Sequence, residues 1–220
     1  MTLGELKIAC YKLIDPSDEA VQVENISEVY EKDTSYSFYF LNMLNSINSA
    51  ITRIVQACIL PLKKLEIDCK TVYEPNKRKI MIDLKRIADD IYKIKHIEYQ
   101  SKNGESCKMD YRLIGNFLEF LQKENGSIAV YYFPKIKNLE VCFKNQKQTE
   151  DMNQLDLNEI GLDDGILSMI PYFVKADLLE HDKPTEAVLA RNTFEQYLAS
   201  FESPEIEIKK TNQSWWRVLL

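Results

Sequence analysis

Histidine, glycine and proline are scarce in this sequence. Its 220 residues include two His, six Gly and seven Pro. So low a content of glycine and proline excludes a collagen-like chain and a low-complexity disordered one. A zinc site needs three or four convergent ligands. His96 and His181 lie far apart in the sequence, and no local cluster completes such a set around either. We therefore expect neither a metal site nor a cofactor.

Paired cysteines and long apolar runs are missing as well. The five cysteines are Cys10, Cys58, Cys69, Cys107 and Cys142. Their number is odd and none forms a CxxC pair, which indicates separate reduced thiols and not a disulfide framework. No apolar run reaches the length of a membrane span. The first residues predict an amphipathic helix that contains Glu5, unlike a secretory signal. We expect a protein that folds in a cytoplasm and does not enter a membrane.

A basic excess is also absent. The net charge is −6, whereas a general nucleic-acid-binding surface carries a positive excess. The basic run Lys77-Arg78-Lys79 lies in a predicted turn and is typical of a solvated tip. Contact with an acidic partner is the alternative interpretation of that run.

The sequence contains none of the motifs GxxxxGK, GxGxxG, GxSxG and HExxH. Two acidic pairs, Asp89-Asp90 and Asp163-Asp164, are the remaining candidates for chemistry. The second pair precedes a predicted helix, where carboxylates favour the positive end of the helix dipole. Capping accounts for it better than catalysis does, so we do not expect an enzyme.

Apolar residues at helical spacing predict four helices. Thr2 and Glu5 form a capping box at the start of a helix over residues 2–14. A longer helix is predicted over residues 36–60. Its apolar seam consists of Phe40, Leu44, Ile47, Ile51, Ile54 and Cys58.

Residues 155–201 predict two antiparallel helices that meet at His181-Asp182-Lys183, with Pro184 in the first turn of the second helix. The first stripe is Ile166, Met169, Ile170, Phe173, Val174 and Leu178, and the second is Ala187, Ala190, Phe194, Leu198 and Phe201.

Between the helices the period changes from 3.6 to 2, which predicts strands. We expect strands over residues 65–71, 79–84, 91–100, 106–113, 116–121 and 127–133, with a further one over 139–143. Alternation in the last full strand places Tyr131 and Phe133 on its core face. The predicted fold class is α+β: a helical bundle from residues 1–62 and 150–202, a small antiparallel β-sandwich or barrel inserted at 63–149, and an extended tail at 203–220.

Two parts of the chain are candidates for contacts with other proteins. The helix over 36–60 carries a nearly uncharged face of Asn42, Asn45, Asn48, Thr52 and Gln56. The sequence is compatible with two roles for this face: plain solvent exposure, or a second packing surface. The tail carries the predicted partner-binding residues, namely Ile206, Ile208, Trp215, Trp216, Arg217, Val218, Leu219 and Leu220. Alternation at Ile206 and Ile208 also suits a strand that pairs with another chain.

The order of these segments resembles the head-to-tail adaptor (connector) proteins of tailed bacteriophages. The resemblance rests on the capped first helix, the long helix ending at Pro61, a β-module ending in SIAVYYFP, a linker with LDLNEIG, and the hairpin up to Phe201. It covers essentially the whole chain in order, is strongest from Ser127 to Phe201, and is a pattern of element types, not a catalytic signature. Residues 17–34 and the Trp-rich tail have no counterpart in the family pattern.

The resemblance implies a structural virion protein in the neck region of the particle, assembled in the bacterial host cytoplasm. It implies a homo-oligomeric ring, often of twelve copies, that binds the portal, extends the DNA channel and serves as a platform for the tail or for tail-terminator or stopper proteins. The acidic net charge suits a channel that does not grip DNA. The alternative is a soluble module whose β-sandwich binds a small ligand or carbohydrate through Tyr131, Tyr132 and Phe133.

Overall fold

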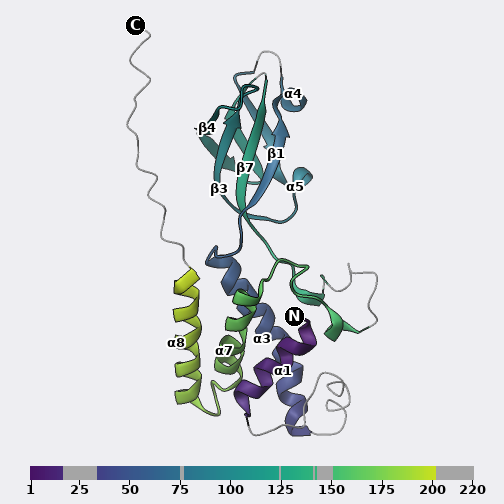
Figure 1. Ribbon diagram of the computed structural model, residues 1–220, viewed down its shortest axis with the longest axis vertical. Coiled ribbons are helices and arrows are strands. Elements are labelled where there is room, and N and C mark those ends of the chain that lie inside the picture. Colours follow the sequence, from purple (N-terminus) through teal and green to yellow (C-terminus); the bar gives the residue numbers. More distant parts are fainter. Residues whose placement is uncertain (17–33, 75–76, 124, 141, 143–150, 202–220) are drawn as a thin grey trace.

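Figure 1 shows the computed structural model of the chain, which describes residues 1–16, 34–74, 77–123, 125–140, 142 and 151–201. These residues contain six α-helices and two antiparallel sheets, so the α+β class is confirmed. The four long helices lie together at one end of the molecule and the strands lie together at the other (Figure 1). Each group surrounds its own apolar core.

The long helices begin and end close to where the sequence predicts. They are α1 (Leu3–Ile14), α3 (Thr34–Gln56), α7 (Asp164–Leu178) and α8 (Pro184–Phe201). The predicted capping box of α1 is present: the Glu5 N–H donates to Thr2 Oγ1 at 3.2 Å, and the Thr2 N–H donates to Glu5 Oε2 at 2.7 Å. Asp163 caps α7 by accepting from the Ile166 N–H at 2.9 Å. The acidic pair at 163–164 therefore has the capping role that we expected.

Helix α3 ends before its predicted end. Its last residue is Gln56, and Cys58 has a φ of 57°, in the left-handed region. That conformation turns the chain away from the helix axis. Cys58 is therefore half-buried beyond the helix and is not part of the apolar seam, which corrects the prediction. The seam residues Ile47, Ile51 and Ile54 are buried as expected.

The segment after residue 150 is tied to the first helix. Lys7 is 6% exposed, and its Nζ donates to Oδ1 of Asn153, in the 3₁₀ turn η2 (Met152–Gln154), at 2.9 Å. Burial lowers the pKa of Lys7, and the nearby Asp151 carboxylate opposes that shift. The Leu3 N–H also donates to the Leu155 carbonyl at 2.9 Å. Residues far apart in the sequence thus share the helical core.

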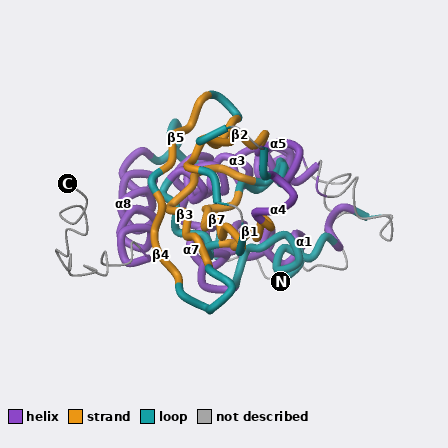
Figure 2. The backbone as a smooth tube through the Cα atoms, turned by 90° about the horizontal axis from the view of Figure 1, so that it is seen from above, coloured by secondary structure: helices purple, strands orange, loops and turns teal. Residues whose placement is uncertain are grey.

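In the described part of the chain, seven strands form the two sheets. They are β1 (Lys63–Asp68), β2 (Lys79–Asp83), β3 (Ile91–Gln100), β4 (Ser106–Met109), β5 (Tyr111–Ile114), β6 (Phe117–Leu121) and β7 (Ser127–Pro134). The larger sheet has the order β1-β7-β3-β4, and the smaller sheet has the order β2-β6-β5. The inward side chains of both sheets form one core, which includes Ile97, Leu118, Phe120 and Ile128. Seen from above, β2 and β5 lie to one side of β1, β7 and β3 (Figure 2).

Three strand predictions need correction. Residues 106–113 form two strands, because β4 pairs with β3 and β5 pairs with β6 in the other sheet. Residues 69–72 form the short helix α4 (Cys69–Val72), since the Asp68 carboxylate caps its first turn by accepting from the Lys70 N–H at 2.9 Å. Leu139 and Glu140 are helical where a last strand was predicted. Another short helix, α5 (Leu84–Ile87), follows β2 in the same way, capped by Asp83.

Tyr132 anchors the end of β7. It is 5% exposed, and its hydroxyl donates to Asp90 Oδ1 at 3.0 Å. Burial, together with this bond to a carboxylate, raises the pKa of Tyr132 to about 12. The folded protein therefore holds the phenolic proton at pH values where an unfolded chain releases it.

The raised pKa of Tyr132 predicts that the folded protein loses stability at alkaline pH. An unfolded tyrosine titrates near pH 10, so the contribution of Tyr132 is present in full below that pH and is lost as the pH rises toward about 12. Tyr132→Phe should cost about 1 kcal/mol near neutral pH and should reduce the alkaline fall. Urea unfolding at neutral and alkaline pH measures both effects. Tyr92→Phe, at an exposed position, is the control; equal alkaline loss in all three proteins would contradict this role of Tyr132.

Candidate functional site

The residues that the sequence suggests for partner binding lie outside the described part of the chain. This applies to Ile206, Ile208, Trp215, Trp216, Arg217, Val218, Leu219 and Leu220. Their role stays a prediction. The candidate sites that the structure does describe are surfaces on α8, on α3 and on the two sheets.

Helix α8 turns an uncharged face outward. Val188 and Leu189 are 59% and 63% exposed, and Tyr197 is 41% exposed. The other exposed residues of the helix are also uncharged, namely Pro184, Thr185, Asn192, Gln196, Ala199 and Ser200. A helix face that meets water ordinarily carries charged side chains. We call this surface the α8 face; an exposed aliphatic pair in an uncharged surround is typical of a protein contact.

The charged residues of α8 have partners within the subunit. Glu195 Oε2 lies 2.9 Å from Nη2 of Arg53 on α3. Glu186 lies 3.3 Å from Lys175 Nζ, and this bond lowers the pKa of the Glu186 carboxyl. The Arg191 guanidinium lies over the Phe173 ring, 4.5 Å from its centroid. These partners draw the charged groups toward α3 and α7, although the Glu186 and Glu195 side chains stay 45% and 42% exposed at the edge of the α8 face.

Aromatic contacts fix α8 against α7. Phe194 is fully buried, and its ring meets that of Phe173 edge-on at 5.0 Å between centroids. The rings of Tyr172 and Tyr197 lie 5.5 Å apart. The predicted inward stripes are thus confirmed, and the two helices run side by side as a hairpin (Figure 1). The outward face was not predicted from the sequence; its signal was the lack of Lys and Glu at positions 188, 189, 192, 196 and 199.

The amide face of α3 is used in part within the subunit. Asn48 accepts through Oδ1 from the Leu139 N–H at 3.0 Å and donates through Nδ2 to Glu140 Oε2 at 3.3 Å. It therefore holds the segment that returns from the strands to the helices. Asn45, Thr52 and Gln56 are exposed. The remaining amide face is available for a further contact.

The smaller sheet carries an apolar patch on its outer side. Met81, Ile114, Phe117 and Leu121 are between 41% and 53% exposed. Glu119 lies among them, opposite Met81 on one side and Arg112 on the other, and it pairs with Lys79 at 3.2 Å. Single exposed apolar residues are common on proteins, but a group of four on one short sheet is typical of an interaction site. We call this group the sheet patch.

The outer side of the larger sheet corrects the prediction for the aromatic run. Tyr132, not its neighbours, points into the core, while Tyr131 and Phe133 are half-buried on the opposite side. There the Tyr131 ring stacks on His96 with 4.5 Å between centroids, and Lys95 lies over Phe133. The three aromatic side chains therefore do not line one surface, and they do not form the ligand pocket of the alternative hypothesis.

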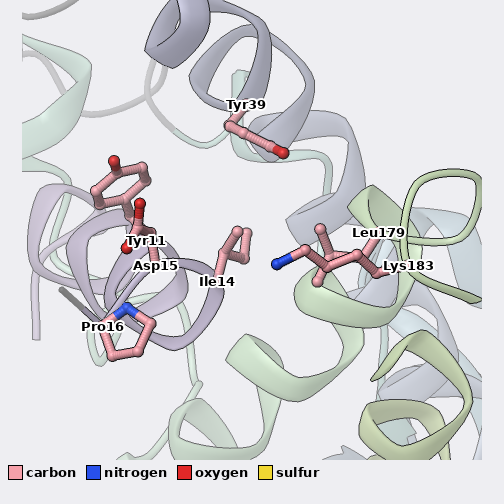
Figure 3. A pocket seen from close by; sticks show the side chains of 7 residues that line it. All are labelled: Tyr11, Ile14, Asp15, Pro16, Tyr39, Leu179 and Lys183. Carbon is pink, nitrogen blue, oxygen red and sulfur yellow. The ribbon is translucent and has the colours of Figure 1, made fainter. Parts of the chain in front are cut away.

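A pocket of about 330 Å³ lies among the helices instead. Figure 3 shows Tyr11, Asp15 and Pro16 on one side of it and Leu179 and Lys183 on the other. Ile14 and Tyr39 complete the lining. The pocket lies where α1 ends, near the turn between α7 and α8. None of its lining residues belongs to the aromatic run at 131–133 that was the predicted ligand site.

Buried thiols behave as core residues. Burial raises the pKa of Cys10 and of Cys69, which keeps both in the neutral form. Within the described ranges, no three His, Cys, Asp or Glu side chains gather closely enough to hold a metal ion. In the same part of the chain, no helix is long and apolar enough to cross a membrane.

No protein-family model matches this chain. A search of curated proteins also finds no match.

Proposed function

We propose that this protein is a structural subunit that works by assembly, as a head-to-tail adaptor of a tailed bacteriophage. In this proposal residues 1–62 and 150–202 form one four-helix bundle, residues 63–149 are a β-sandwich inserted into it, and residues 203–220 extend from it. Copies form a ring in the virion neck, bind the portal, extend the DNA channel and support the tail or its stopper proteins. The order of segments that resembles this family gives the proposal its specific form.

The α8 face is the observation that carries the proposal. A monomer gains nothing from exposing Val188 and Leu189 in an uncharged surround, and all charges of the helix are already satisfied within the subunit. Against another protein the same surface removes apolar area from water, and the charged groups at its edge keep their partners within the subunit. A ring also needs two different surfaces that fit each other head to tail. The exposed amides of α3 are the second surface, because amides tolerate burial better than Lys or Glu.

The tail residues complete the proposed contacts. Trp215, Trp216, Val218, Leu219 and Leu220, with Arg217, bind the portal or a neighbouring subunit, and Ile206 and Ile208 pair with a strand edge. Large aromatic side chains are frequent anchors in protein interfaces. DNA passes through the ring without specific binding, in keeping with the net charge of −6.

The mass of the assembled protein tests the proposal. The purified chain is measured by mass photometry over a concentration series, alone and with the portal protein of the same particle. For the chain alone we expect a single closed oligomer whose mass is an integral multiple of 25.7 kDa, and with the portal a species that exceeds the portal mass by such a multiple. If the protein is monomeric at every concentration and does not bind the portal, the proposed ring is refuted.

A further inference from the structure

We propose that in the free subunit the sheet patch is covered by residues 203–220 of the same chain. The exposed patch on β2, β5 and β6 is the acceptor, and the Trp-rich tail is its occupant. The tail is then bound to the surface of its own subunit before it meets a portal or a neighbour. This docking does not depend on ring formation.

The sheet patch is suited to an extended apolar segment. Phe117 and Leu121 lie two positions to either side of Glu119 on the central strand β6. Met81 on β2 is opposite Glu119, and Ile114 on β5 is opposite Phe117. The four apolar side chains therefore surround the carboxylate across all three strands. The exposure of these four side chains leaves the outer side of the sheet open to a peptide.

The tail has the composition that such a patch favours. Five of the six residues 215–220 are apolar, including Trp215 and Trp216. Each large aromatic side chain brings substantial apolar area to a contact. Further toward α8, Glu205 and Glu207 alternate with Ile206 and Ile208. Lys209 and Lys210 follow directly, so the tail offers an apolar end and a start in which acidic and basic side chains balance.

Charge does not oppose the apolar contact. Lys79 and Arg112 lie on the outer side of the small sheet, where Lys79 pairs with Glu119 and Asp83 lies opposite Phe117. Asp83 pairs in turn with Arg86. The charged residues of the three strands therefore balance, and residues 202–220, whose acidic and basic side chains also balance, meet no net repulsion there.

Length and direction favour the same chain over a second copy. The C-terminal end of α8 points toward the half of the molecule that contains the strands (Figure 1). The 19 residues from 202 to 220 span up to about 60 Å when extended. A tethered segment that can reach its site meets it at an effective concentration of about millimolar, which a second copy in dilute solution does not match.

Photocrosslinking in the full chain tests the docking. p-Benzoylphenylalanine replaces Phe117, which is 42% exposed, and the irradiated dilute protein is digested and analysed by mass spectrometry. Equal amounts of ¹⁴N- and ¹⁵N-labelled chains are mixed beforehand. We expect cross-links to peptides from residues 203–220 with both halves carrying the same isotope. The same probe at Tyr92, an exposed position on a strand of the larger sheet, should give no such product.

A second variant separates specific docking from chance encounters. Leu121→Glu places a carboxylate in the sheet patch at a side chain that is 53% exposed, so the fold should survive, as an unchanged melting temperature would show. The cross-link from position 117 should then be lost. Mixed-isotope products, cross-links only to other segments, or equal yield in Leu121→Glu would each overturn the proposal. The ring mass remains the separate test of the proposed function, since this cross-link forms within one subunit.

Discussion

Replacing Leu189 by Glu is expected to abolish assembly and to leave the subunit folded. Leu189 is 63% exposed, so the substitution removes little packing within the subunit. In the ring the new carboxylate would be buried against a neighbour without a partner. Such an unpaired charge costs about 3 kcal/mol or more per interface, which is more than a hundredfold in Kd. The same loss recurs at every contact of a closed ring.

Mass photometry and thermal melting measure the two halves of this prediction. Leu189→Glu should give monomers at concentrations where the natural sequence gives the oligomer, with an unchanged melting temperature. The matched control is Leu62→Glu, which makes the same chemical change at a residue 40% exposed outside α8. If Leu189→Glu still forms an oligomer of normal mass, α8 is not part of the interface.

Phe194→Ala should instead unfold the helical half of the protein at low denaturant. Phe194 is fully buried, meets Phe173 edge-on at 5.0 Å and fills the space between α7 and α8. Truncating a buried phenylalanine costs about 3–5 kcal/mol, a large share of the 5–15 kcal/mol that typically stabilises a domain. Assembly should fail as well, because α8 would no longer be held in place.

Urea unfolding followed by far-UV circular dichroism measures this loss. Val188→Ala on the exposed side of the same helix is the control, and it should change stability by less than about 0.5 kcal/mol. If Phe194→Ala costs no more than the control does, the contact between α7 and α8 is not what holds α8 to the subunit.

The features that the sequence predicts well depend on local chemistry. The Thr2–Glu5 capping box, the Asp163 cap and the apolar stripes of α7 and α8 all rest on residues within a few positions of each other. Strand β3 has the predicted bounds, because alternating Ile and Tyr residues lie between clear turn signals. The confirmed α+β class follows from these elements.

The predictions from sequence fail where contacts with residues distant in the sequence determine the local structure. Whether residues 106–113 form one strand or two depends on β3 and β6, which lie elsewhere in the sequence. Alternation alone does not say which side of β7 faces the core. Tyr132 lies on that side with Ile128 and Val130, and its hydroxyl donates to Asp90. The sequence alone does not reveal the α8 face either. Glu186, Arg191 and Glu195 indicate a solvent-exposed helix until their partners on α3 and α7 are known.

Imaging of the assembled particle tests the central claim most directly. Cryo-electron microscopy of the oligomer, at a resolution that separates helices, should show a closed ring in which α8 of each subunit lies against its neighbour. A ring held together through the strands, with α8 facing solvent all around, would contradict the account.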